Sequence, residues 1–190
     1  IAEPFGVVAA VIPSTNPTST TIYKLLIAMK ARCAVVLSPH PAAVRCITDI
    51  AERMAKAAQR AGAPDDAINV MGTVTIEGTQ ELMKHRDVAV ILATGGMGLV
   101  RAAYSAGKPA YGVGPGNAPA YIESSADIPK AVRDITLGKT FDNGVLCSAE
   151  NSVVADHSIA DTVKEEFKSQ GGYFLTPSQI SALSSTLITT

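Results

Sequence analysis

The run Gly6-Val7-Val8-Ala9-Ala10-Val11-Ile12 decides the class of fold. Its apolar and partly β-branched residues fill the length of one strand. The following residues, 18–31, place their apolar side chains at helical spacing, and residues 34–37 are again strand-like. A strand, a helix and a second strand in this order predict a βαβ unit with parallel strands.

The same alternation continues along the chain. We expect helices at residues 41–61, 76–84, 97–106 and 127–138, and strands at residues 68–71, 88–93, 110–113 and 120–122. The run Val88–Ala93 is continuously apolar, as in a central parallel strand. The sequence therefore predicts an α/β fold with a Rossmann-like, doubly wound parallel sheet and right-handed crossovers.

A further unit is expected after Cys147. A strand at 152–155, a helix at 159–169, a brief extended piece at 173–175 and a helix at 177–187 follow from the pattern. About 40 residues is near the lower limit for an independent core. This segment is expected either to pack on the first unit or to begin a domain that the chain does not complete.

Composition excludes several classes of function. The 190 residues are 47% hydrophobic, with 16 basic and 17 acidic residues, so no basic surface for nucleic acid is expected. The apolar stretches are too short to cross a bilayer, and the first residues do not have the pattern of a signal peptide. We expect a cytoplasmic protein without nucleic-acid or membrane partners. The start at isoleucine suggests an excised piece of a longer chain.

The cysteines and histidines do not have the spacing of a disulfide framework or of a metal site. They are Cys33, Cys46, Cys147, His40, His85 and His157. We expect Cys33 and Cys46 to be small buried hydrophobic residues. Cys147 instead follows a Gly-containing turn and precedes an apolar strand, where a thiolate can be presented to a small substrate. On the residues alone, structural and catalytic roles for Cys147 are both open.

Two loops lead from predicted strands into helix N-termini, which favour anions, and a third segment is a glycine-rich turn. Residues 93–98 contain a Gly-Gly turn that can approach a pyrophosphate, although such a turn is also a common connector. The loop 13–20, which contains Asn16, supplies polar side chains but is also explained by helix capping. The glycine-rich residues 112–119 form either a tight crossover or part of a site.

Several ordered motifs together resemble the aldehyde dehydrogenase superfamily, specifically its CoA-acylating branch. The resemblance covers essentially the whole chain. The segments that carry it are Ile1-Ala-Glu-Pro-Phe-Gly, Pro13-Ser-Thr-Asn-Pro-Thr-Ser-Thr, Ser38-Pro-His-Pro, Ile91-Leu-Ala-Thr-Gly-Gly-Met-Gly, Tyr104-Ser-Ala-Gly-Lys-Pro-Ala, Gly112-Val-Gly-Pro-Gly-Asn and Lys139-Thr-Phe-Asp-Asn-Gly-Val-Leu-Cys.

The resemblance implies a catalytic pair. Cys147 would be the nucleophile that attacks an aldehyde carbonyl. The side-chain amide of Asn16 and the backbone N–H of Cys147 would stabilise the resulting oxyanion. Hydride transfer to NAD would then leave an acyl thioester on Cys147.

The resemblance also implies a set of cofactor-binding residues. A pyrophosphate-side turn, a segment beside the adenosine ribose and one further glycine contribute to it. These residues are Thr94, Gly95, Gly96, Met97, Ser38, Pro39, His40 and Gly114. Hydrolytic members commonly carry lysine at or next to the position of Ser38, so the choice between NAD and NADP stays open.

The acceptor of the acyl group is inferred from a missing acid. Hydrolytic members have a glutamate at the start of a Glu-Leu-Gly-Gly segment that activates water, and the matching residues 112–116 contain no acid. A thiol such as coenzyme A is then the expected acceptor. Glu150 is a conceivable substitute base, but its place at the start of a strand favours a structural or solvated role.

The resemblance sets the expected domains. Residues 1–146 would form most of a nucleotide-binding domain, and residues 147–190 the incomplete beginning of a catalytic domain. The chain alone is expected to be folded but weakly active or inert, and the full-length protein to be a homo-oligomer. Acetaldehyde is the first candidate substrate. A hydrolytic NAD(P)-dependent enzyme and a noncatalytic nucleotide-binding module are the alternatives.

Overall fold

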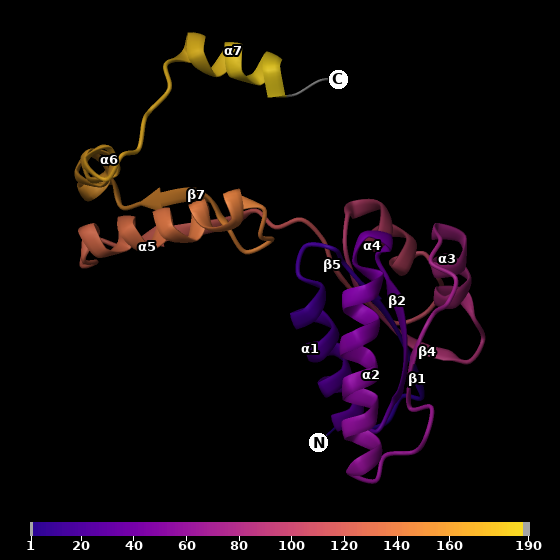
Figure 1. Ribbon diagram of the computed structural model, residues 1–190. Helices are drawn as coiled ribbons and strands as arrows, with labels where there is room; N and C mark the ends of the chain where they lie inside the picture. Colours follow the sequence, from indigo (N-terminus) through magenta and orange to yellow (C-terminus); the bar gives the residue numbers. More distant parts are fainter. Residues whose placement is uncertain (1, 188–190) are drawn as a thin grey trace. The chain divides into compact units, whose positions relative to one another are not determined.

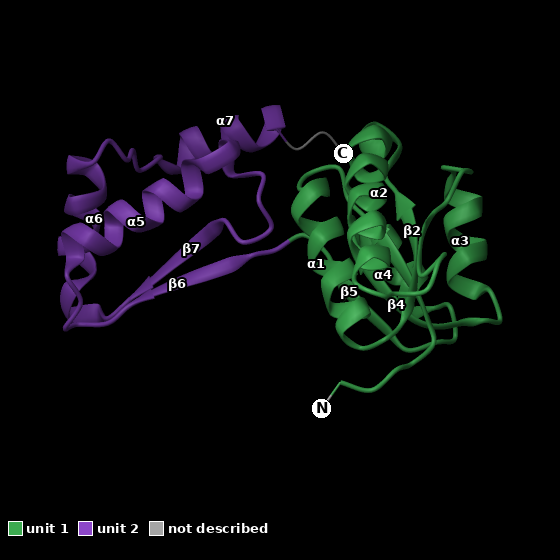
Figure 2. Ribbon diagram, turned by 60° about the horizontal axis from the view of Figure 1, so that its bottom comes forward, with its two compact units in different colours: residues 1–115 green, residues 116–190 purple. Residues whose placement is uncertain are grey.

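The computed structural model describes residues 2–187 and consists of two compact units, Ile1–Pro115 and Gly116–Thr190 (Figures 1 and 2). This division lies earlier than the boundary expected after residue 146. The reason is strand pairing, because β6 (Ala118–Ile122) pairs with β7 (Glu150–Ala155). The segment before Cys147 therefore shares a core with the segment after it.

Unit 1 contains a five-stranded sheet in which all paired strands are parallel. Its strands are β1 (Val7–Ile12), β2 (Ala34–Pro39), β3 (Ile68–Val70), β4 (Val88–Thr94) and β5 (Ala110–Val113). The spatial order is β3-β2-β1-β4-β5, so the strand order reverses between β1 and β4. This topology confirms the predicted α/β fold with a doubly wound parallel sheet.

Helices cover both faces of this sheet (Figure 1). They are α1 (Pro17–Lys30), α2 (Val44–Arg60), α3 (Ile76–Lys84) and α4 (Met97–Tyr104). On one face, Leu25 of α1 and Ile47 of α2 share a core with Val8. On the other face, Met83 of α3 packs in a core with Ala9. Successive residues of β1 thus point to opposite faces, and both faces are buried, as its uninterrupted apolar sequence predicts.

The helix expected at residues 41–61 is divided. A 3-10 helix, η1 (Pro41–Ala43), precedes α2, and Ala43 has φ −126°, outside the helical range. The His40 ring Nδ1 accepts a hydrogen bond of 3.1 Å from the backbone N–H of Ala42. This local cap stabilises the short turn ahead of the long helix.

Unit 2 is a two-stranded parallel sheet covered by helices. Its remaining elements are α5 (Ile128–Thr140), η2 (Phe141–Gly144), η3 (His157–Ile159), α6 (Ala160–Ser169) and α7 (Pro177–Leu187). Ile122, Val132 and Val163 form its buried core. Residues 173–175 form no paired strand.

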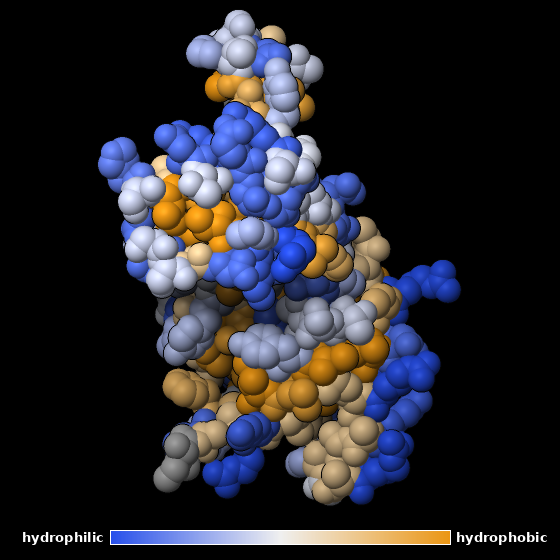
Figure 3. Space-filling model, turned by 90° about the vertical axis from the view of Figure 1, so that its left-hand side faces the viewer, coloured by the Kyte–Doolittle hydropathy of each residue, from blue (hydrophilic) through white to orange (hydrophobic). Residues whose placement is uncertain are grey.

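Apolar side chains remain exposed on the sheet of unit 2. Tyr121 of β6 and Val153 and Val154 of β7 are exposed. Figure 3 shows that apolar patches occur on the surface of the molecule. Within residues 2–187, none of the helices has the length and apolar character needed to span a membrane.

Candidate active site

The predicted residues of unit 1 follow strands that end at one edge of the sheet. Asn16 follows β1, Ser38–His40 lie at the end of β2, Thr94–Met97 at the end of β4, and Gly114 after β5. Because these strands are parallel, their carboxyl ends share one edge. The loops after β1 and β4 flank the point where the strand order reverses, which is the usual ligand crevice of such sheets.

The two glycine-rich loops lie side by side. The backbone N–H of Gly95 donates a hydrogen bond of 3.0 Å to the carbonyl oxygen of Val113. A Cβ atom placed on Gly114 would lie 3.1 Å from Sδ of Met97. The structure thus brings Gly114 to the loop that contains Gly95, Gly96 and Met97.

The N-terminus of α4 is open to a ligand. Its N-cap residue, Gly96, makes no side-chain cap to the free backbone N–H groups of the first turn. A Cβ atom on Gly96 or Gly98 would meet nothing within 4 Å. The backbone is therefore accessible, and the helix dipole favours a negative group there. These features fit the pyrophosphate of a dinucleotide.

The side chain of Asn16 is not used as a helix cap. Asn16 is the N-cap residue of α1 but makes no side-chain hydrogen bond to the helix. Its Oδ1 accepts a hydrogen bond of 3.3 Å from the Thr15 hydroxyl. With the oxygen oriented toward Thr15, the two N–H groups of the amide are left as donors. The capping explanation drawn from the sequence is therefore not how this side chain is used.

The predicted ribose-binding segment presents one side chain to solvent. Ser38 is 2% exposed, and its Oγ lies 2.8 Å from Oγ1 of Thr79. Pro39 is also buried, whereas His40 is exposed. Of these three residues, His40 is the one whose side chain is available to a bound nucleotide.

Cys147 lies in a tight turn after a left-handed segment. Asp142, Asn143 and Gly144 all have positive φ values, of 48°, 54° and 71°. Asp, Asn and Gly tolerate this conformation best, which explains the local sequence. A hydrogen bond of 3.1 Å from the N–H of Ala149 to the carbonyl of Leu146 then closes the turn that contains Cys147.

This turn presents the thiol to solvent. Cys147 is a free, exposed cysteine, whereas Ala149 is 2% exposed and anchors the end of the turn. Within residues 2–187, the backbone N–H of Cys147 forms no hydrogen bond, so it is a free donor. An exposed sulfur beside a free N–H suits a nucleophile and one oxyanion donor.

A sequence model described as the aldehyde dehydrogenase family matches residues 1–171. The chain belongs to the aldehyde dehydrogenase family.

Relatives in this family match nearly the whole chain. The bifunctional aldehyde-alcohol dehydrogenase AdhE of Escherichia coli strain K12 is 47% identical over 188 residues, which are 99% of this chain and 21% of that protein. The crystal structure of an acetylating aldehyde dehydrogenase from Geobacillus thermoglucosidasius has 54% identity and a TM-score of 0.85, and the match covers 100% of this chain and 42% of that one.

A third relative was solved with a ligand. The propionaldehyde dehydrogenase of Rhodopseudomonas palustris, with bound propionyl-CoA, has 35% identity and a TM-score of 0.82. That match covers 99% of this chain and 42% of the solved one. The present chain thus spans about two fifths of the two solved structures and one fifth of the E. coli protein.

The two predicted catalytic residues of this family member lie in different units. Asn16 belongs to unit 1 and Cys147 to unit 2.

The other two cysteines differ from each other. Cys33 is buried, as expected, but Cys46 is exposed, with its Sγ 3.1 Å from Oγ1 of Thr18. The expectation that Cys46 is buried is wrong because its neighbour Ile47 is the residue that faces the core of α2.

A buried lysine was not identified from the sequence. Lys24 of α1 is 2% exposed, and its Nζ donates hydrogen bonds of 2.7 Å to the carbonyl of Val11 and 2.8 Å to that of Leu92. Burial lowers the pKa of Lys24 to about 7. The sequence contained an indication of this burial, since Lys24 occurs among the apolar residues of the helical pattern.

Glu150 begins β7 and packs against α5. A Cβ atom on Gly138 would overlap its carboxylate. The Oε2 atom is buried and has no hydrogen-bond partner among the described residues. The carboxylate therefore faces the helix, which agrees with a packing position better than with a solvated one.

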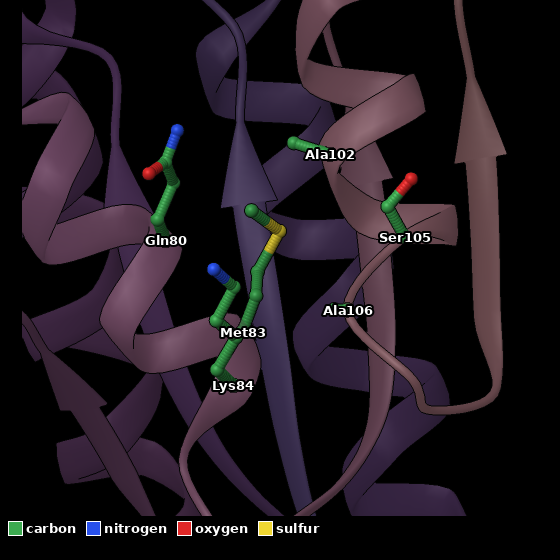
Figure 4. A pocket seen from close by; sticks show the side chains of 6 residues that line it. All are labelled: Gln80, Met83, Lys84, Ala102, Ser105 and Ala106. Carbon is green, nitrogen blue, oxygen red and sulfur yellow. The ribbon is translucent and has the colours of Figure 1, made fainter.

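A small hollow between α3 and α4 lies elsewhere in unit 1 (Figure 4). Met83 and Lys84 of α3 and Ser105 after α4 contribute to its lining. Both helices end there before leading into the starts of β4 and β5, so the hollow lies toward the amino end of the sheet.

No three His, Cys, Asp or Glu side chains are placed to hold a metal ion in residues 2–187.

Proposed function

We propose that this protein is an NAD-dependent acylating aldehyde dehydrogenase that interconverts a short-chain aldehyde plus CoA and acyl-CoA through a thioester on Cys147. The observation that carries the proposal is the presentation of Cys147. Its thiol is exposed on an anchored turn beside a free N–H, in a chain 54% identical to an acetylating member of the family. Because the chain spans part of its relatives, the activity is proposed for the complete enzyme.

The first step is nucleophilic attack. The Cys147 thiolate adds to the carbonyl carbon of the aldehyde, a C–S bond forms, and the carbonyl π electrons move to oxygen. The backbone N–H of Cys147 and the amide of Asn16 donate hydrogen bonds to this oxyanion. The orientation of the Asn16 oxygen toward Thr15 keeps the amide donors available.

Oxidation then leaves the acyl group on Cys147. NAD, when bound, would supply the acceptor for the hydride that leaves the carbon as the oxyanion reforms the carbonyl. The N-terminus of α4 and the accessible backbone at Gly96 are suited to hold the pyrophosphate. His40 is the exposed side chain of the segment expected beside the ribose.

The acyl group is transferred to a thiol. CoA gives up its thiol proton to solvent, its thiolate attacks the thioester carbonyl, and the Cys147 thiolate leaves, so one thioester bond forms as the other breaks. Residues 112–116 contain no acid that would activate water. The propionyl-CoA bound to the R. palustris relative supports a CoA thioester as product or substrate.

The test measures NADH formation from acetaldehyde by the full natural chain that contains this sequence. Wild type and Cys147→Ala are compared with and without CoA. We expect turnover that requires both CoA and Cys147, with acetyl-CoA as product. NADH formation that is indifferent to CoA and yields free acetate would show a hydrolytic enzyme instead.

A second variant examines the remaining acid near the nucleophile. We expect Glu150→Gln to retain CoA-dependent turnover, because its carboxylate packs against α5. CoA-independent acetate formation that disappears in Glu150→Gln would assign Glu150 as a base for water and overturn the acylating proposal. An inert protein with nucleotide affinity would favour the noncatalytic module.

A further inference from the structure

The turn that carries Cys147 follows a backbone conformation that is costly to maintain. Three successive residues, Asp142 to Gly144, lie in the left-handed region. Such conformations persist only where the surrounding structure holds them. The surroundings of this segment therefore contain its anchors.

One anchor is Lys139, which precedes the segment and contacts its last residue. Lys139 occupies the last turn of α5, and its side chain crosses over Gly144. A Cβ atom on Gly144 would lie 3.0 Å from the carbonyl oxygen of Lys139 and 3.3 Å from its Nζ. The Nζ atom donates a hydrogen bond of 2.5 Å to Oδ1 of Asn151 on β7.

The second anchor lies at the nucleophile itself. Nδ2 of Asn151 donates a hydrogen bond of 3.2 Å to the carbonyl oxygen of Gly116. Gly116 in turn packs directly on the backbone of Cys147, where a Cβ atom would overlap the carbonyl oxygen of that residue. Asn151 therefore connects both ends of the loop, with Lys139 and Gly144 at one end and Gly116 and Cys147 at the other.

The charge of Lys139 is not used in an ion pair. Within residues 2–187, no carboxylate lies within 4.0 Å of its Nζ, in contrast to Lys130 on the same helix, which pairs with Asp134 at 2.5 Å. A lysine used only for solubility would not need a fixed partner on β7.

We propose that Lys139 and Asn151 are positioning residues for Cys147. They hold the strained loop so that the sulfur and the backbone N–H of Cys147 are presented together. The inference rests on the proposed function, because it gives Cys147 the role of nucleophile. The inference adds Lys139 and Asn151 to the residues that serve the nucleophile. Both lie outside the Cys147 loop and act on it through Gly144 and Gly116.

The first test uses the full natural chain that contains this sequence and does not depend on enzyme activity. Iodoacetamide labels the exposed thiols, and the peptides of Cys147 and Cys46 are quantified separately by mass spectrometry at several pH values. Cys46 lies on α2 in unit 1 and serves as an internal reference. We expect Lys139→Met and Asn151→Ala to lower the Cys147-to-Cys46 rate ratio at pH 7 at least threefold, and Lys139→Arg to restore it.

The matched control is Lys130→Met, which removes a neighbouring ammonium of α5 that does not contact the loop. It is expected to leave the ratio unchanged. Equal ratios in wild type, Lys139→Met and Asn151→Ala, or higher ratios in these two variants, would overturn the proposal. Far-UV circular dichroism confirms that each variant is folded before the rates are compared.

The second test uses the complete enzyme. We expect Lys139→Met and Asn151→Ala to lower kcat about tenfold while KM for NAD changes less than twofold, because the nucleotide site lies in unit 1. A parallel loss of NAD affinity would indicate general disruption and contradict a positioning role. CoA-dependent turnover in Cys147→Ala would instead refute the proposed function, and the labelling ratio would still report on the anchors.

Discussion

The Nζ atom of Lys24 donates a hydrogen bond of 2.7 Å to the backbone carbonyl of Val11, near the carboxyl end of β1. Its second bond, to Leu92, reaches the neighbouring strand β4. The two strands lead directly into the loops that contain Asn16 and Gly95. Lys24 thus links β1 and β4, the two strands that lead into the loops on either side of the proposed crevice.

Lys24 should make the stability of the chain depend on pH. Burial lowers its folded pKa to about 7, whereas a lysine in the unfolded chain titrates near 10.5. Between these values the unfolded chain holds the extra proton, so this contribution makes stability rise with pH. The full difference is on the order of 3–5 kcal/mol. Urea denaturation of wild type and Lys24→Met from pH 7 to 9 measures the part of this difference that develops over those two pH units.

We expect the stability of wild type to increase relative to Lys24→Met across this range, because methionine keeps the apolar stem but has no proton to lose. The limiting slope is about 1.4 kcal/mol per pH unit. Two stability curves that run parallel from pH 7 to 9 would contradict the lowered pKa of Lys24.

Asn16 is expected to affect catalysis without affecting stability. Its side chain makes no cap to α1, so Asn16→Ala removes no helix-capping bond. Loss of one oxyanion donor typically costs about 10²–10³ in kcat. Steady-state turnover and thermal unfolding of the complete enzyme check both statements. Thr15→Val, which removes only the donor to Oδ1, is the control and should have a much smaller effect on kcat.

Gly96 provides a test of the dinucleotide loop. It has φ −69°, and a Cβ atom at this position would meet open space, so alanine fits without strain. We expect Gly96→Ala to leave unfolding unchanged or slightly stabilised, since alanine restricts the unfolded chain. The added methyl would obstruct the approach of a pyrophosphate and weaken NADH affinity at least tenfold, measured by fluorescence titration.

The matched control is Gly72→Ala, where a Cβ atom also meets nothing within 4 Å but the loop follows the edge strand β3. Its affinity for NADH should equal that of wild type. If Gly96→Ala also binds NADH normally, the first turn of α4 does not approach the pyrophosphate.

The local pattern of the sequence predicted most elements of unit 1. The strand at Ala110–Val113 and the helix at Ile76–Lys84 have the predicted bounds, because apolar periodicity is a local property. Pairing partners are not local. β6 was placed in the first domain, yet its partner is β7, and the intervening helix α5 packs against α6.

The site was only partly predictable for the same reason. Asn16 and Gly95 were predicted as site residues from loops after strands and from the family resemblance. The burial of Lys24 depends on two carbonyl groups from different strands, and lysine is ordinarily exposed. The contact of Gly116 with Cys147 joins residues 31 positions apart and leaves no pattern in the sequence.

This last contact can be tested by adding a single methyl group. Gly116→Ala would place Cβ on the carbonyl oxygen of Cys147, and two backbone segments would have to separate. Overpacking of this kind typically destabilises by about 1–3 kcal/mol. We expect a lower urea midpoint for unit 2 and a changed ratio of Cys147 to Cys46 labelling. Asn117→Ala alters the adjacent residue without adding atoms to this contact and should leave both quantities near wild type. A Gly116→Ala chain with normal stability and normal labelling would show that Gly116 does not hold the nucleophile loop.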